Sequence, residues 1–110
     1  MNNTLSVMQG DQYGIPFEIT DKDGNLLTDV SVDDVEIVIG EVRKTLSSGE
    51  ITYSEKEGAF LFPLTQAESF GMIERTQRVQ VRVKLAGTDT VIGEDLGKVD
   101  ITYAKSKEVL

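Results

Sequence analysis

The chain has 110 residues, of which 39% are hydrophobic and 27% are charged, and its 11 basic and 19 acidic residues give a net charge of −8. This composition is typical of one globular domain, and the negative charge argues against general attraction to the phosphate backbone of nucleic acids. The sequence contains neither cysteine nor histidine, which excludes disulfides, thiolate nucleophiles, cysteine-bound zinc and histidine general bases.

Apolar and polar residues alternate through most of the chain, a pattern typical of half-buried antiparallel strands. The pattern is clearest in RVQVRVKL, residues 78–85, where every second residue is valine or leucine. In chain order the predicted strands are marked by Leu5 and Val7; Ile15, Phe17 and Ile19; Val35, Ile37 and Ile39, with Val42 and Leu46 as a weaker extension of the same strand; Ile51 and Tyr53; Phe60, Phe62 and Leu64; residues 78–85; and Val99, Ile101 and Tyr103.

Turns and one short helix are predicted between these strands. The glycine-bearing segments DKDGN, SSGE, EKEG, AGTD and EDLG indicate turns. In LTQAESFG, Glu68 follows Thr65 by three positions and Gly71 comes last, which is the capping-box pattern of a helix of one or two turns. The sequence therefore predicts an all-β, immunoglobulin-like antiparallel β-sandwich of about seven or eight strands, with one short helix near residues 65–71. We expect a single domain over residues 1–110, with flexible ends at 1–3 and 105–110.

The DKDGN segment resembles the start of a calcium loop, because Asp21, Asp23 and Asn25 alternate beside a glycine. A helix-loop-helix calcium site requires glycine at its sixth position and glutamate at its twelfth. Counted from Asp21, Gly24 is the fourth residue and Val32 the twelfth. The spacing favours a tight turn with positive φ at Gly24 and no bound ion. A weak surface calcium site formed by Asp21, Asp23 and Asp29 is the alternative.

One face of the strand at residues 78–85 is polar and basic, with Arg78, Gln80, Arg82 and Lys84 on it. Such a face can contact an acidic partner surface, including that of a second copy of this chain. The favoured interpretation is ordinary pairing with carboxylates on neighbouring strands. Nucleic-acid binding is not expected, because aromatic residues are not interleaved on this face.

The remaining motifs argue against catalysis and against a membrane. The carboxylates form no recognisable catalytic pair, and the glycines form neither GxGxxG nor a phosphate loop. We therefore expect no enzymatic activity, no cofactor and no small-molecule substrate. No apolar run approaches the roughly 20 residues of a membrane span, and the polar start MNNTLSVMQGD is not a signal peptide.

The segment VMQGDQYGIPFEITDKDGNLLTDVSVDDVEIVIG, residues 7–40, resembles the immunoglobulin-like N-terminal domain of baseplate and tail proteins from phages of Gram-positive hosts. The segments LFPLTQAESFGMI, VQVRVKL and SKEVL are similar to small phage or prophage proteins of about this length. The resemblance brings no catalytic or ligand-binding residue with it. It implies a non-enzymatic virion structural or assembly protein, associated with the tail or baseplate, in the virion or the host bacterial cytoplasm. Its partners would be other phage structural proteins or copies of itself. The alternative is a surface β-sandwich module that binds carbohydrate or, weakly, calcium.

Overall fold

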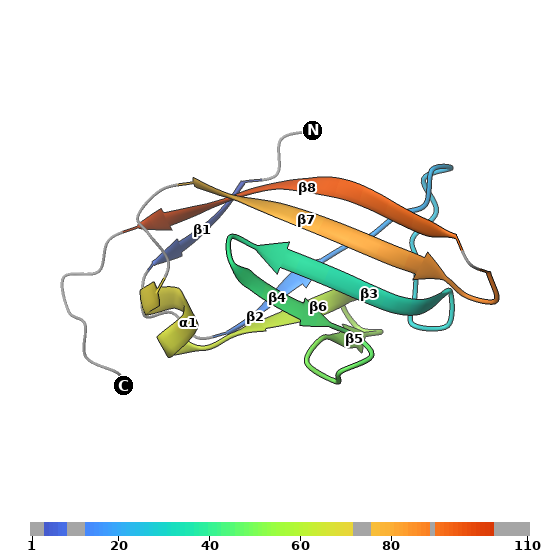
Figure 1. Cartoon of the computed structure of the whole chain (residues 1–110), viewed down its shortest axis with the longest axis horizontal. Helices are drawn as coiled ribbons and strands as arrows, with labels where there is room; N and C mark the ends of the chain where they lie inside the picture. Colours follow the sequence, from blue (N-terminus) through green and yellow to red (C-terminus); the bar gives the residue numbers. More distant parts are fainter. Residues whose placement is uncertain (1–3, 9–12, 72–75, 89, 103–110) are drawn as a thin grey trace.

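The computed structural model describes residues 4–8, 13–71, 76–88 and 90–102, and these form strands and one short helix (Figure 1). In chain order the elements are β1 (Thr4–Met8), β2 (Tyr13–Phe17), β3 (Val32–Ile39), β4 (Val42–Thr45), β5 (Thr52–Ser54), β6 (Ala59–Leu64), α1 (Gln66–Gly71), β7 (Thr76–Leu85) and β8 (Val91–Thr102). The strands predicted from the alternation are present in this part of the chain, but the predicted extension of the third strand through Val42 and Leu46 is wrong. The chain turns at residues 40 and 41, and β4 pairs antiparallel with β3.

The strands form two sheets, one with the order β1-β8-β7-β3-β4 and the other with the order β2-β6-β5. In an immunoglobulin sandwich the third, sixth and seventh strands share one sheet, whereas the second, fourth and fifth share the other. Strands β3, β7 and β8 correspond to the first group and β2, β5 and β6 to the second, with β4 as an added edge strand. The predicted immunoglobulin-like sandwich is therefore confirmed.

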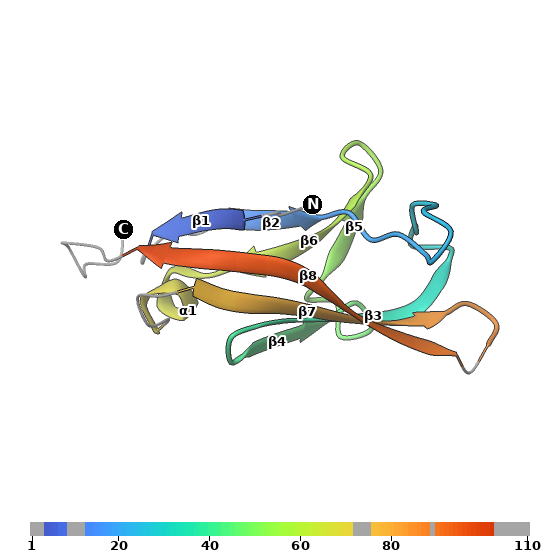
Figure 2. The ribbon, with the colours of Figure 1, turned by 90° about the horizontal axis from the view of Figure 1, so that it is seen from above.

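Strand β1 departs from the antiparallel pattern. It lies beside β8 and pairs with it in parallel, with Thr4 opposite Lys98 and Met8 opposite Thr102 (Figure 2). The chain then crosses to the other sheet, where β2 pairs antiparallel with β6. The first strand therefore lies in the five-stranded sheet, at the edge next to the last strand.

The core lies between the sheets and follows the predicted period-two pattern. On β7 the side chains of Val79, Val81 and Val83 are buried, and on β6 those of Phe60 and Phe62 are fully buried. The complete buried cluster is Ile15, Ile19, Leu27, Val32, Val35, Ile37, Ile39, Ile51, Phe60, Phe62, Leu64, Val79, Val81 and Val83. Because alternate side chains of a strand point to opposite faces, the polar residues between them lie on the outer faces.

The prediction of a turn at EDLG, residues 94–97, is wrong, because β8 runs through this segment without a break. The pairing with β7 shifts there: Val79 lies opposite Gly97 and Gln80 opposite Asp95, so Leu96 is an extra residue. This is a β-bulge, which accommodates one additional residue and bends the strand without ending it. Tyr103 and the predicted flexible ends lie outside the described residues.

Helix α1 begins with the predicted capping box. The backbone N–H of Glu68 donates to Thr65 Oγ1 at 3.1 Å, and the backbone N–H of Thr65 donates to Glu68 Oε1 at 2.9 Å. These reciprocal bonds satisfy two N–H groups that a helix start otherwise leaves without partners. Gly71 is the last helical residue, so the short helix near residues 65–71 is confirmed.

Candidate functional site

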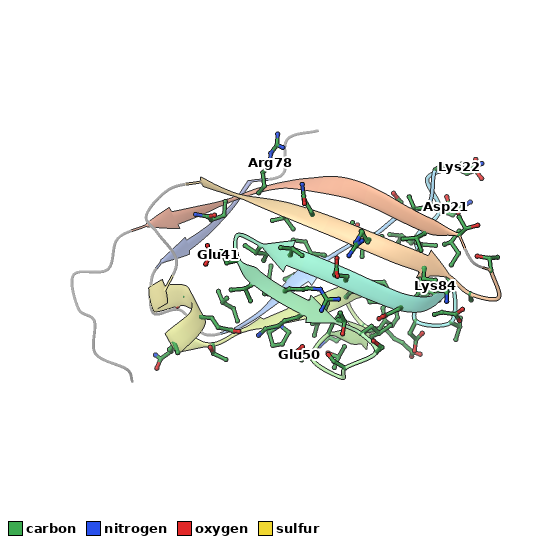
Figure 3. The ribbon with its side chains drawn as sticks, viewed as in Figure 1. Asp21, Lys22, Glu41, Glu50, Arg78 and Lys84 are labelled. Carbon is green, nitrogen blue, oxygen red and sulfur yellow. The ribbon has the colours of Figure 1, made fainter. Side chains whose placement is uncertain are left out.

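The predicted contact residues lie together on the outer face of the five-stranded sheet. Strand β7 lies between β8 and β3, and Arg78, Gln80, Arg82 and Lys84 are all exposed along it. Figure 3 shows Arg78 and Lys84 near opposite ends of the strand. We call this surface, with the neighbouring outward residues of β3 and β4, the basic sheet face.

Two arginines on the basic sheet face share one carboxylate. Arg82 Nε donates to Glu36 Oε1 at 2.8 Å and Arg82 Nη2 donates to Glu36 Oε2 at 3.1 Å, while Arg43 Nε bonds to the same Oε2. The hydrogen bond from Arg82, and after it the bond from Arg43, hold the pKa of Glu36 below its ordinary value even though burial opposes this. Arg82 therefore makes a cross-strand ion pair, and its guanidinium has a defined orientation.

Lys84 lies opposite Asp34 in the strand register, but the Asp34 carboxylate bonds to other groups. It accepts the backbone N–H groups of Val35 and Ser47 and the hydroxyl of Ser47, each at 2.9 Å. Lys84 makes no ion pair with any residue in the described part of the chain. Lys84 is exposed on β7, and its charge is therefore available to a partner protein.

The buried cation Lys44 is part of the interior and does not belong to the basic sheet face. Its side chain is only 6% exposed, and its Nζ donates to Glu68 Oε1 at 2.7 Å and to the backbone oxygen of Pro63. The ammonium also lies 5.3 Å from the centroid of the Phe62 ring, within the range of a cation–π interaction. These contacts join β4, β6 and α1, so Lys44 has a structural role.

Burial raises the pKa of Glu68, but the hydrogen bonds from Lys44 and Thr65 outweigh this effect, and the resulting pKa is below its ordinary value of 4.5. The carboxylate is thus charged at neutral pH and bonded to its own chain. Sequence reasoning missed both Arg43 and Lys44. The one available signal was the alternation in VRKT, which puts Lys44 on the same face as Val42.

The DKDGN segment forms the predicted turn, and the φ of Gly24 is 86°. Asp21 Oδ1 accepts the backbone N–H groups of Asp23 and Asn25, both at 2.9 Å. The bond from Asn25 is the main reason that the pKa of Asp21 is lowered. This carboxylate therefore stabilises the turn that contains it.

The structure does not bring the three candidate calcium ligands together. Asp21, Asp23 and Asp29 belong to no metal-holding group of three or more acidic, cysteine or histidine residues in the described ranges 4–8, 13–71, 76–88 and 90–102. Over the same residues, no helix has both the length and the apolar character that crossing a bilayer requires.

No protein-family model, curated protein or solved structure matches the chain.

Proposed function

We propose that the chain is a non-enzymatic structural or assembly protein of a phage particle, associated with the tail or baseplate, which contacts neighbouring proteins through the basic sheet face. The contact is inferred from one observation: an exposed row of polar and basic residues lies on a chain of net charge −8. The row is Arg78, Gln80, Arg82 and Lys84. The phage particle is inferred from the resemblance of residues 7–40 to tail and baseplate proteins.

The chemistry of this face suits protein recognition. Arginine is enriched at interfaces because its planar guanidinium forms directional bonds with carboxylates and packs well. On this face Glu36 orients the guanidiniums of Arg43 and Arg82, which lowers the conformational entropy lost when a partner binds. A local basic surface on an acidic chain favours acidic partners and fixes the orientation of approach.

The two-sheet architecture supports the same role. A sandwich with a continuous core presents a rigid sheet face, and rigid interface backbones are common in preorganised complexes. Particles are built from repeated contacts between identical or related subunits. A face carried by the inner strands β7 and β3, away from the sheet edges, can take part in such contacts without altering strand pairing.

The test is mass spectrometry of gradient-purified particles from a producing strain, combined with a charge-reversed variant. We expect the chain in particles at a fixed ratio to the other structural proteins. Lys84→Glu should reduce its incorporation, whereas Lys56→Glu, the same charge change on the exposed β5–β6 turn, should not. Absence of the wild-type chain from purified particles would overturn the phage assignment.

A further inference from the structure

Two connections meet at the end of the sandwich opposite α1, as Figures 1 and 2 show. They are the β2–β3 loop, residues 18–31, and the β7–β8 turn, which begins at Ala86. The backbone N–H of Ala86 donates to the oxygen of Ser31 at 3.0 Å, and the N–H of Gly87 donates to Asp33 Oδ2 at 3.4 Å. We call this end, with the adjoining residue Asp33, the loop end.

The loop end collects exposed apolar side chains. Within the described residues the large hydrophobic side chains that are exposed are Leu26, Val30 and Val91, which are 50%, 82% and 57% exposed. Leu26 and Val30 belong to the β2–β3 loop, whereas Val91 begins β8 opposite Lys84 and lies on the basic sheet face. A single exposed apolar residue needs no explanation, but a concentration of them at one end is typical of a contact surface.

Acidic residues flank Leu26 and Val30 in the sequence. Residues 20–33 contain four aspartates, Asp21, Asp23, Asp29 and Asp33, and a single lysine, Lys22. Figure 3 shows Asp21 and Lys22 at this end of the molecule. The loop end therefore combines exposed apolar groups with an excess of negative charge.

The basic sheet face has the complementary arrangement. Val38 on β3 is a partly buried apolar residue, and it lies opposite Arg43 on one side and the uncharged Gln80 on the other. Arg82 and Lys84 extend the positive charge along β7. Val38 beside Arg43, and Val91 beside Lys84, match apolar side chains with acidic neighbours in both charge and polarity.

We propose that the loop end of one molecule docks on the basic sheet face of a second copy of this chain. The inference rests on the proposed role of the basic sheet face as a contact surface, and it names the partner. Because the two surfaces are different regions of the same molecule, the contact is heterologous. Contacts of this kind close into a ring or continue as a filament.

Light scattering on purified protein tests the proposal. At about 20 mM salt we expect the mass to rise with concentration beyond that of a dimer. At about 500 mM salt the electrostatic part of the contact is screened and the mass should fall toward that of a monomer. Strict monomers at every concentration in low salt would overturn the proposal.

Two variants each remove one side of the contact. Asp23→Lys combined with Asp29→Lys alters only the loop end, and Lys84→Glu alters only the basic sheet face. Each should weaken self-association by at least about tenfold. Glu55→Lys and Lys56→Glu change charges of the same types on the exposed β5–β6 turn and should leave self-association unchanged.

Mixing the two variants distinguishes this contact from a symmetric one. The loop variant keeps an intact sheet face and the face variant keeps an intact loop end, so the mixture should assemble although neither variant does so alone. The two altered surfaces also carry opposite charges, so the mixture can grow beyond one-to-one dimers. A mixture that stays monomeric, or single variants that assemble like the wild type, would overturn the proposal.

A further variant tests the apolar side chains. Val30→Ser should weaken assembly at both salt concentrations, because it removes an apolar group and no charge. Circular dichroism and thermal melting of every variant check that the sandwich is intact. An unchanged assembly in a folded Val30→Ser protein would overturn the role of the apolar side chains at the loop end.

Failure of this inference and failure of the phage assignment are separable. A chain that is found in particles but is monomeric when purified overturns only the self-docking inference. A chain that self-associates in the way described but is missing from particles overturns only the phage assignment.

Discussion

At the level of single residues, the turn after Thr20 depends on Gly24 for its backbone angle and on Asp21 for its hydrogen bonds. Gly24 has a φ of 86°, in the left-handed region that side chains with a Cβ adopt at a cost. Asp21 accepts two backbone N–H groups, which is the usual way in which aspartate stabilises a turn. This turn forms part of the loop end, so both residues act on the shape of the proposed docking surface.

Substituting Gly24→Ala should lower the free energy of unfolding by about 1 kcal/mol. A Cβ at this position would meet no atom within 4 Å, so the loss would come from the backbone angle alone. Urea denaturation at neutral pH measures it.

Gly71→Ala is the matched control, because a Cβ there also meets open space but the φ is not positive. It should change stability by less than about 0.5 kcal/mol. Equal losses in the two variants would contradict the explanation by backbone angle.

At the level of elements, α1 depends on tertiary contacts because it has only six residues, too few for a stable isolated helix. The capping box satisfies its first N–H groups, and Lys44 joins it to β4 and β6. An inward-pointing lysine on a short edge strand also disfavours pairing of that edge with another chain. Strand β4 forms such an edge of the five-stranded sheet, so Lys44 both holds the helix and protects the edge.

The Lys44–Glu68 pair predicts a pH-dependent contribution to stability. The folded pKa of Glu68 lies below the ordinary value of 4.5. The contribution is therefore present above about pH 4.5 and is lost as the pH falls through the lowered folded pKa. Glu68→Gln keeps a capping-box residue but loses the charge, so it should cost about 1 kcal/mol at pH 7.

The difference between wild type and Glu68→Gln should shrink as the pH is lowered below about 4.5, as measured by urea denaturation at several pH values. Glu57→Gln makes the same chemical change at an exposed turn position and should remain within about 0.5 kcal/mol of wild type. A difference for Glu68→Gln that stays constant down to pH 3 would show that charge pairing with Lys44 does not contribute.

At the level of the whole molecule, the sandwich is held together by the apolar side chains between its sheets. Ile37 on β3 is fully buried, whereas the next residue, Val38, lies on the basic sheet face. The edge strands of the three-stranded sheet are β2 and β5. Strand β5 has only three residues, and β2 contains Pro16. Proline and short strands at edges disfavour strand addition, so neither edge of this sheet is suited to pairing with another chain.

Ile37→Ala should lower the free energy of unfolding by about 2–5 kcal/mol, because it leaves a cavity in the core. Val38→Ala removes apolar atoms one position away on the outer face and should cost less than about 1 kcal/mol. Denaturant titration of both proteins measures the difference. Similar losses at the two positions would contradict the assignment of faces on β3.

The residues that sequence reasoning placed correctly are those that depend on near neighbours. The alternation at Val79, Val81 and Val83 determines which face of β7 is buried, the spacing of Thr65 and Glu68 determines the helix start, and Gly24 determines its turn. Each of these features is encoded within a few residues, so the pattern alone is sufficient.

The features that only the tertiary structure decided depend on strands far apart in the sequence. Strand β8 continues through EDLG because of its register against β7. Arg43 and Arg82 share Glu36 because β3 lies between β4 and β7. Lys44 is buried because α1 and β6 lie beside β4. The loop end is also formed by distant segments that meet at Ser31 and Ala86. Strand order and register are set by the best burial of the whole core. The sequence by itself therefore determined the faces, the helix cap and the turn, and the packing of the two sheets decided which surfaces came together.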